Sequence, residues 1–141
     1  MQTSQAGKDL IRQYEGLKLT AYKCSAGKDT IGYGHTHGVK PGDHITQAQA
    51  EAFLDEDLAV FELTVNTAIK RPMNPHQFDA MVALAFNIGG AAFAGSTLVK
   101  KFNTGDIQGA AKEFPRWCHC GRIVMPGLVK RRAAEREMFL L

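Results

Sequence analysis

The chain has 141 residues and a formal net charge of +3, with 45% hydrophobic and 22% charged residues. This composition is typical of a one-domain globular protein and excludes a fibrous, low-complexity or intrinsically disordered chain. Mild basicity favours anionic polymers, such as nucleic acid or bacterial wall material, without selecting among them. No run of about eighteen apolar residues occurs, so we expect no stable insertion into a membrane.

Three cysteines are present, Cys24, Cys118 and Cys120, and this odd number rules out a complete set of disulfides within one chain. Cys118 and Cys120 are too close in sequence to bridge each other comfortably. We therefore expect synthesis in a reducing compartment. Residues 1–15 carry charges and no long apolar run, so we expect no signal peptide.

The N-terminal part of the chain predicts a helix followed by a β-hairpin. Apolar residues recur at helical spacing over residues 5–15, with Ser4 or Thr3 as the expected N-cap. Residues 17–36 are rich in glycine and in strand-forming residues, and they predict two antiparallel strands around a turn at residues 25–28.

The remainder predicts helices. Thr46 and Gln49 form a capping box that begins a helix extending to about Asn66. Asn74, followed by proline, begins a helix to about residue 88 that is apolar on nearly every side and should therefore be central to the core. Further expectations are short helices over 97–104 and 107–114, a helix end or kink at Pro115, a turn over 117–124 and a final helix over 126–139.

These elements predict an α+β fold, mostly helical, in which a small N-terminal antiparallel β-hairpin lobe packs against a helical lobe. We expect a single domain of residues 1–141. The hairpin lobe would take about residues 16–45, the helical lobe residues 1–15 and 67–141, and the connecting helix about 47–66.

Glu15 is the leading catalytic candidate, because it ends a helix and is followed by the polar hairpin. The negative end of the helix dipole disfavours a carboxylate there and so favours the protonated acid. A protonated carboxyl group can donate a proton to a glycosidic oxygen. The alternative is an ordinary solvated glutamate at a helix end.

Cys24 and Thr30 follow Glu15 by nine and fifteen positions and would face it from the hairpin. Taken alone, Cys24 is a small buried apolar residue and Thr30 an ordinary strand residue. Facing a single acid, the pair could hold a water molecule. Thr30 would act through its hydroxyl, and Cys24 as a thiolate base or a nucleophile.

The spacing of Glu15, Cys24 and Thr30 resembles the active-site pattern of the phage-type lysozymes, glycoside hydrolase family 24. Other stretches resemble this family as well, and together they cover nearly the whole chain in order: Thr30–Thr36, Gln77–Ala80, Phe86–Gly89, Phe93–Leu98, Trp117 and Pro126–Arg136.

The resemblance implies a lysozyme-like fold and an endolysin that hydrolyses, with inversion, the β-1,4 bond between N-acetylmuramic acid and N-acetylglucosamine in peptidoglycan. It implies that Glu15 is the proton donor and that Thr30 orients the water. Cys24 would stand where the family usually has an aspartate, which leaves its role open as base, nucleophile or spacer. Matching positions imply substrate contacts at Thr36, Phe86 and Thr97, and a purely structural role in the core is the alternative for Phe86.

The resemblance also implies a monomer that binds peptidoglycan glycan strands without a cofactor and does not bind nucleic acid. It would remain in the host cytoplasm until a holin releases it to the periplasm. No metal site is expected, because the His and Cys residues at 35–37 and 118–120 lack the paired spacing of zinc ligands.

The basic run at residues 130–132, together with Arg136, has two interpretations. Glu135 and Glu137 interleave with it, which favours a solvated helix face. One of these arginines could instead approach Glu15. Two alternative functions remain open for the whole chain: a lytic transglycosylase acting on the same bond, and a non-catalytic module that binds wall material or nucleic acid.

Overall fold

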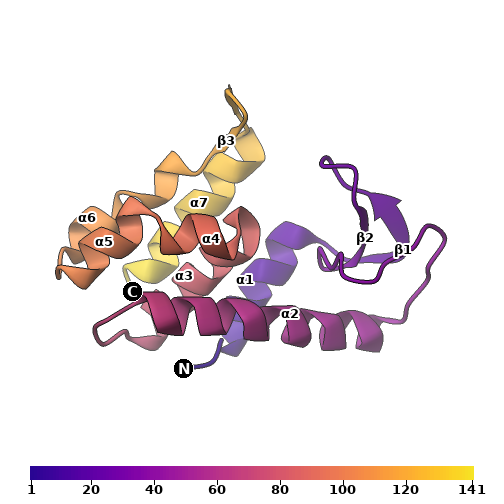
Figure 1. Cartoon of the computed structure of the whole chain (residues 1–141), viewed down its shortest axis with the longest axis horizontal. Helices are drawn as coiled ribbons and strands as arrows, with labels where there is room; N and C mark the ends of the chain where they lie inside the picture. Colours follow the sequence, from indigo (N-terminus) through magenta and orange to yellow (C-terminus); the bar gives the residue numbers. More distant parts are fainter.

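The computed structural model describes all 141 residues, and Figure 1 shows the arrangement of its elements. In chain order they are α1 (Gln5–Glu15), β1 (Lys18–Lys23), β2 (Asp29–Gly32), α2 (Gln47–Ala68), α3 (Pro75–Ile88), α4 (Gly90–Ala94), α5 (Thr97–Asn103), α6 (Ile107–Ala111), the 3-10 turn η1 (Phe114–Arg116), β3 (His119–Cys120), β4 (Ile123–Val124) and α7 (Pro126–Phe139). The predicted α+β, mostly helical fold class is confirmed. None of the helices combines the length and the apolar character that crossing a membrane would require.

β1 and β2 form the predicted antiparallel hairpin, in which Tyr22 pairs with Thr30. The turn is closed by backbone hydrogen bonds, with the Cys24 amide donating to the Lys28 carbonyl at 3.0 Å and the Gly27 amide donating to the Cys24 carbonyl at 2.8 Å. The loop that follows returns to β1 through a bridge between Thr20 and His44. Cys24 and Thr30 are therefore held at one end of a small, locally closed unit.

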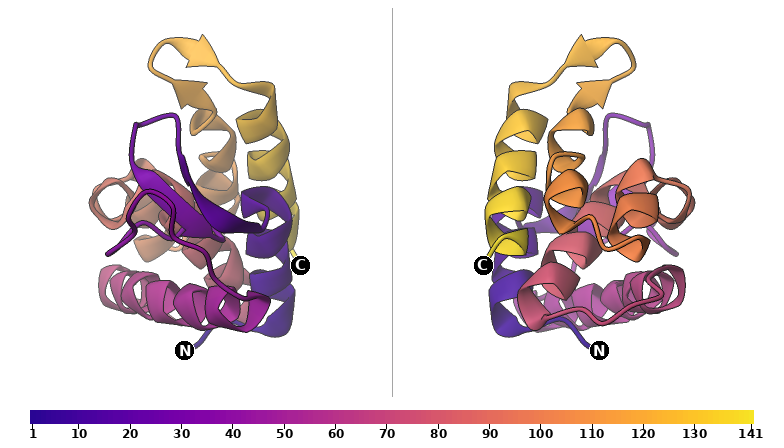
Figure 2. Two further views of the ribbon diagram at one scale, coloured as in Figure 1. Left: turned by 90° about the vertical axis from the view of Figure 1, so that its right-hand side faces the viewer. Right: turned by 90° about the vertical axis from the view of Figure 1, so that its left-hand side faces the viewer.

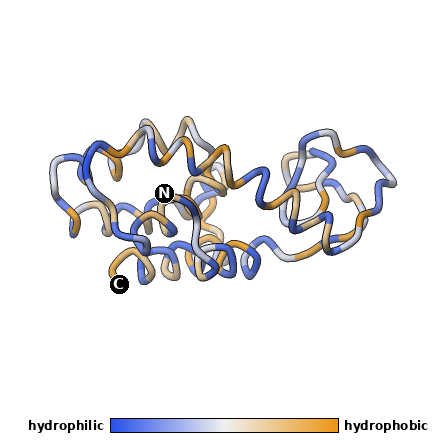
Figure 3. The backbone as a smooth tube through the Cα atoms, turned by 90° about the horizontal axis from the view of Figure 1, so that it is seen from below, coloured by the Kyte–Doolittle hydropathy of each residue, from blue (hydrophilic) through white to orange (hydrophobic).

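α2 runs from the hairpin to the other helices and lies beneath both in Figure 1, and the backbone trace in Figure 3 shows the two bodies of chain that it joins. The predicted capping box of Thr46 and Gln49 is present at its N-terminus. The helix ends at Ala68, two residues beyond the predicted Asn66. It buries Ala50, Leu54, Leu58 and Val65, which follow helical spacing, against the core.

α3 is the central helix of the core, as its apolar sequence predicts. Asn74 caps it with a capping box to Gln77, and every residue from Phe78 to Ala85 is buried. It contacts α1, α2, α4 and α7. The last turn of α3, which carries Phe86 and Asn87, is less deeply buried.

Two local predictions were wrong, and one short helix was not predicted. Residues 117–124 are not a simple turn, because they contain the two-stranded ribbon β3–β4, which projects beyond the helices in Figure 2. Strands of two residues are too short to show an alternating sequence pattern. Gly89 ends α3 as expected, but Gly90 begins a further short helix, α4. The helix predicted to reach residue 114 ends at Ala111, and Pro115 lies in η1 instead.

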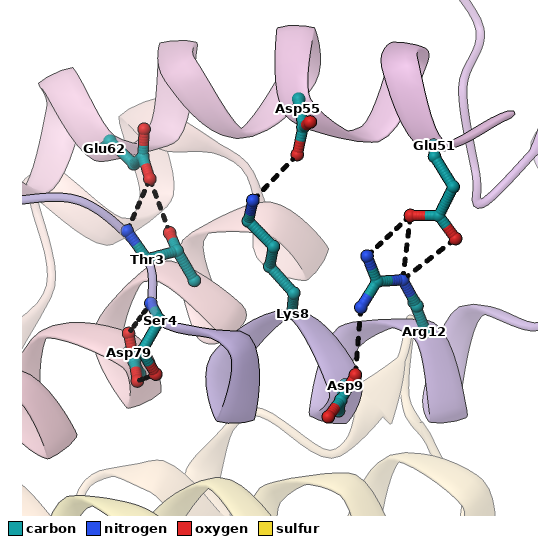
Figure 4. Close-up of polar contacts among 9 residues, drawn as sticks. All are labelled: Thr3, Ser4, Lys8, Asp9, Arg12, Glu51, Asp55, Glu62 and Asp79. Atoms are coloured by element: carbon teal, nitrogen blue, oxygen red, sulfur yellow. Dashed lines mark hydrogen bonds and ion pairs between the residues drawn. The ribbon is translucent and has the colours of Figure 1, made fainter. Parts of the chain in front are cut away.

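Polar contacts hold α1 along α2, as Figure 4 shows. The Thr3 backbone amide and hydroxyl donate to Glu62 at 2.6 and 2.7 Å. Lys8 lies 3.0 Å from Asp55. These contacts fix the direction of α1 and with it the position of the helix end that carries Glu15.

Arg12 and Glu51 form the last of these contacts, with the Arg12 Nη2 atom 2.5 Å from a Glu51 oxygen. The Tyr33 hydroxyl, from the hairpin lobe, donates to the same carboxylate at 3.1 Å. Hydrogen bonds from Arg12 hold the pKa of Glu51 below its usual value, and the same interaction raises the pKa of Arg12. Glu51 therefore joins α1, α2 and the hairpin lobe at one point.

Candidate active site

Glu15 is the last residue of α1, and Gly16 ends the helix with a φ of 71° that favours glycine. The Glu15 side chain is 18% exposed, and its Oε2 atom lies 2.6 Å from Nη1 of Arg131 on α7. One member of the basic run therefore does approach Glu15, as the second of the two interpretations anticipated. The contact joins residues 116 positions apart in the chain.

The predicted solvated face of α7 is wrong at Arg131, Arg132 and Glu135, all of which are buried. Arg131 Nε donates to Glu135 at 3.1 Å, and its Nη2 donates to the Ala83 carbonyl at 3.3 Å. Arg132 Nη2 donates to Glu135 at 3.0 Å. This face of α7 packs on α3, so a cluster that looks amphipathic and solvated in sequence is the inner face of the helix.

Burial of this cluster has an electrostatic cost. It raises the pKa of Glu135 and lowers that of Arg132, and the ion pairs between them oppose both shifts. Because both arginines hydrogen-bond the same carboxylate, Glu135 fixes the Arg131 guanidinium in the position from which it reaches Glu15. Glu135 thus positions Arg131, and this role was not predicted from the sequence. Its spacing of four residues from Arg131 and three from Arg132 is nevertheless the spacing at which side chains on a helix form ion pairs.

Cys24 lies at the hairpin turn and is partly buried, and Thr30 is buried on β2. The Thr30 hydroxyl donates to the Lys28 carbonyl at 2.9 Å. Hydrogen bonds from the Lys28 backbone, from the Thr30 hydroxyl and from the Ala26 backbone lower the pKa of the Cys24 thiol. A hydroxyl has one hydrogen, so Thr30 can serve either the Lys28 carbonyl or the sulfur at any one time, while its oxygen remains an acceptor.

Tyr22 and Gly34 connect this hairpin chemistry to Glu15. Burial raises the pKa of Tyr22, and so do the negative charges of both Glu15 and Cys24. Tyr22 is thus within electrostatic range of both residues, and Thr30 is its strand partner. Gly34 lies against the acid, because a Cβ atom there would be 2.5 Å from Oε1 of Glu15.

Glu15 opens into a cavity of about 490 Å³ between α1, α3 and α7. A neighbouring cavity of about 510 Å³ shares three of its lining residues, Asn87, Met125 and Leu128. This second cavity also contacts Ser25 of the β1–β2 turn and Trp117 before β3. Together the two cavities form a cleft that runs from Glu15 toward the space between the two hairpins.

A third cavity, of about 310 Å³, lies on the other side of Gly34. Its lining residues include Thr36 and Phe86, two of the residues suggested as substrate contacts. Phe86 is half-buried and packs 5.4 Å from Phe61, so it also belongs to the edge of the core. Thr97 is exposed at the first position of α5 and lines none of these three cavities.

Two of the three histidines of the hairpin lobe, His35 and His44, are engaged within the protein. His35 is buried, lies 2.8 Å from Asp57 on α2 and stacks on Phe53 with ring centroids 4.2 Å apart. His44 shares a hydrogen bond of 2.9 Å with Thr20. The His35–Asp57 pair was not foreseen from the sequence, and it connects the hairpin lobe to α2 beside the third cavity.

Comparison with known proteins agrees with this geometry. The phage lysozyme family model matches residues 12–135. The chain is 52% identical over 143 residues to the endolysin of Acyrthosiphon pisum secondary endosymbiont phage 1, with 99% of this chain and 98% of the relative covered.

Solved structures of similar proteins superpose closely. An endolysin from Escherichia coli phage FAHEc1 has a TM-score of 0.92 at 41% identity, covering 99% of this chain and 94% of that one. The muramidase domain of SpmX from Asticaccaulis excentricus has a TM-score of 0.94 at 36% identity, covering 99% and 98%. The chain therefore belongs to the phage lysozyme family, and it is a lysozyme-type hydrolase of the endolysin kind.

Proposed function

We propose that the protein is a muramidase that hydrolyses the β-1,4 bond between N-acetylmuramic acid and N-acetylglucosamine in peptidoglycan. The observation that carries this proposal is the position of Glu15. It is mostly buried, in contact with the buried Arg131, and open to a cavity whose neighbour contacts Ser25 of the β1–β2 turn. One similar solved structure is itself named a muramidase domain.

Glu15 is proposed as the general acid. It ends α1, and Nη1 of Arg131 lies 2.6 Å from its Oε2 atom. Proton transfer from the Glu15 carboxyl group to the glycosidic oxygen breaks the C1–O bond and leaves a carboxylate. Arg131 is already in place to stabilise that carboxylate, so no rearrangement is needed during the reaction.

Cys24 and Thr30 are proposed to act on the water. In an inverting hydrolysis the water attacks C1 from the face opposite the leaving group while a base accepts its proton. The lowered pKa of Cys24 increases the thiolate fraction available as that base. Thr30 would orient the same water through its hydroxyl oxygen, and Thr36 and Phe86 would contact neighbouring sugars from the third cavity.

We further propose that the enzyme degrades the host wall at the end of phage infection, since the relatives are named endolysins. A holin-type partner would give it access to the periplasm. The site is built from residues of one chain, which supports action as a monomer. The hairpin lobe and the helical lobe of this single domain would flank the bound glycan.

The decisive experiment compares Glu15→Gln with Glu56→Gln, which changes an exposed glutamate on α2. Removal of a general acid should lower the rate of wall clearing by about 10²–10⁴-fold, while Glu56→Gln should be unaffected. The assay is turbidity of permeabilised Gram-negative cells, with circular dichroism to confirm folding. Near-normal lysis by folded Glu15→Gln would defeat the assignment.

Product analysis on purified peptidoglycan fixes the reaction type. Hydrolysis gives fragments that are heavier by one water than the anhydro products of a lytic transglycosylase, and mass spectrometry separates the two. Anhydro products would replace the hydrolase assignment with the transglycosylase one. Wall binding without any cleavage would indicate a non-catalytic module.

A further inference from the structure

Exposed aliphatic side chains gather where β4 meets α7. Ile123 is 67% exposed, Val124 52%, Val129 46% and Met125 41%. Single exposed apolar residues are normal on any protein surface, but four large ones within a seven-residue stretch are not scattered. We call these four residues the ribbon patch.

Two residues of the ribbon patch, Ile123 and Val124, lie on a part of the chain that stands away from the body. Figure 2 shows the β3–β4 ribbon projecting beyond the ends of the neighbouring helices. Ile123 and Val124 are consecutive on β4, so their side chains point to opposite faces of the ribbon. Because both are exposed, neither face of the ribbon is covered by the protein.

The stretch of chain that carries the ribbon patch has charges of one sign. The stretch from Phe114 to Ala134 contains lysine and arginine but no aspartate or glutamate. Arg122, in the turn of the ribbon, and Lys130, on α7, are both exposed. The surface therefore offers aliphatic groups with cations beside them, which complements an anionic amphiphile.

We propose that the β3–β4 ribbon binds the surface of anionic phospholipid bilayers, with Ile123 and Val124 entering the boundary between headgroups and acyl chains. Arg122 and Lys130 would contact lipid phosphates. A glycan strand is a poorer fit at Ile123 and Val124, because its hydroxyl groups need hydrogen-bond partners that these two side chains lack. Ile123 and Val124 line neither cavity beside Glu15, whereas Met125 lines both and Lys130 lines the first. The test therefore uses Ile123 and Arg122, which line neither cavity.

The test is co-sedimentation of the full-length protein with vesicles. Vesicles of phosphatidylglycerol and phosphatidylcholine are compared with vesicles of phosphatidylcholine alone, at low and high salt. Ile123→Ser should weaken binding to the anionic vesicles about tenfold through lost apolar contact, and Arg122→Gln about fivefold through lost charge. Leu63→Ser is the matched control, since Leu63 on α2 is 69% exposed but lies outside the ribbon patch. It should bind like the parent.

Ile123→Ser and Arg122→Gln should retain the parent's thermal unfolding midpoint and its rate on soluble wall fragments. Three results would overturn the proposal: no binding of the parent to anionic vesicles at low salt, equal binding to neutral vesicles, or equal weakening by Leu63→Ser. If Ile123→Ser loses affinity for purified sacculi while the parent ignores vesicles, the ribbon is a wall contact and the membrane proposal fails.

Discussion

Gly34 lies so close to Glu15 that no side chain fits between them: a Cβ atom at position 34 would be 2.5 Å from Oε1 of the acid. Gly34 also has a φ of 74°, a left-handed conformation that other residues adopt only with strain. At this point the hairpin lobe therefore approaches the Glu15 carboxylate through backbone atoms, without a side chain between them. Arg131 contacts the other oxygen of the same group, so Glu15 is confined from two sides.

Gly34→Ala should therefore displace Glu15 and lower the rate of wall clearing by about tenfold or more, since misplacement of a reacting group by an ångström is costly. Gly38→Ala is the matched control. Gly38 has a similar φ of 70°, but a Cβ atom added there would have nothing within 4 Å. Both variants carry the backbone strain, and only the first meets the acid. Equal activities of the two in the turbidity assay would show that the Gly34 contact has no catalytic importance.

The buried cluster on α7 gives a prediction about stability. Glu135→Gln leaves Arg131 and Arg132 without their shared carboxylate, and breaking a buried ion pair costs about 3–5 kcal/mol. Glu137→Gln, on the exposed face of the same helix, should change the free energy of unfolding little. Urea denaturation at neutral pH measures both. A Glu135→Gln variant as stable as Glu137→Gln would mean that the cluster contributes no net stability.

The sequence predicted those parts of the fold that rest on local signals. The capping residues of α2 and α3, the all-apolar α3 and the glycine-rich hairpin turn are encoded within a few neighbouring residues, and all are present. The approach of the hairpin lobe to Glu15 could be anticipated, because the hairpin directly follows α1 in the chain.

The sequence was less informative where tertiary packing decides. Arg131, Arg132 and Glu135 have the charge pattern of a solvated helix, and only the packing of α7 on α3 places them inside. From the sequence, any of the three arginines Arg131, Arg132 and Arg136 could have been the one that approaches Glu15, and no local pattern selects Arg131. The contact between Gly34 and Glu15 depends on the angle between two lobes, which no local pattern specifies.

Cys24 should react with iodoacetamide at lower pH than an ordinary thiol. Hydrogen bonds from the Lys28 backbone and the Thr30 hydroxyl lower its pKa, so the thiolate, which is the reactive form, appears earlier as pH rises. The measurement uses a Cys118→Ser/Cys120→Ser background, in which Cys24 is the remaining thiol. Thr30→Val should shift the reactivity profile toward higher pH. A profile in the parent that matches free cysteine would contradict the hydrogen-bonded thiolate.

The same thiol can be tested for its part in catalysis. If the position only needs a base, Cys24→Asp should keep appreciable activity, and Cys24→Ala should lose most of it. The rate of wall clearing should also rise with pH over the same range in which the rate of Cys24 alkylation rises. Full activity of Cys24→Ala would remove the thiol from the mechanism and leave it as a spacer in the turn.

Glu51 should make the stability of the protein depend on pH in the acid range. Its folded-state pKa lies below its usual value, chiefly because Arg12 donates hydrogen bonds to the carboxylate. The stabilisation is therefore complete above the pKa of an unfolded glutamate, near 4.5, and is lost as pH falls through the lower folded value. Both side chains are partly exposed, which limits the contribution of the pair to about 1 kcal/mol.

Urea denaturation of Glu51→Gln and of the parent, at neutral pH and at pH values below 4.5, tests this directly. The difference in unfolding free energy should be largest at neutral pH and should shrink on acidification, because the parent then loses the same ion pair. Arg12→Met should reproduce the effect. Asp55→Asn is the control. The Asp55 carboxylate, which pairs with Lys8, is 59% exposed, so its removal should change the pH dependence of stability less. A difference between Glu51→Gln and the parent that stays constant with pH would mean that packing around residue 51, not its charge, holds α1 on α2.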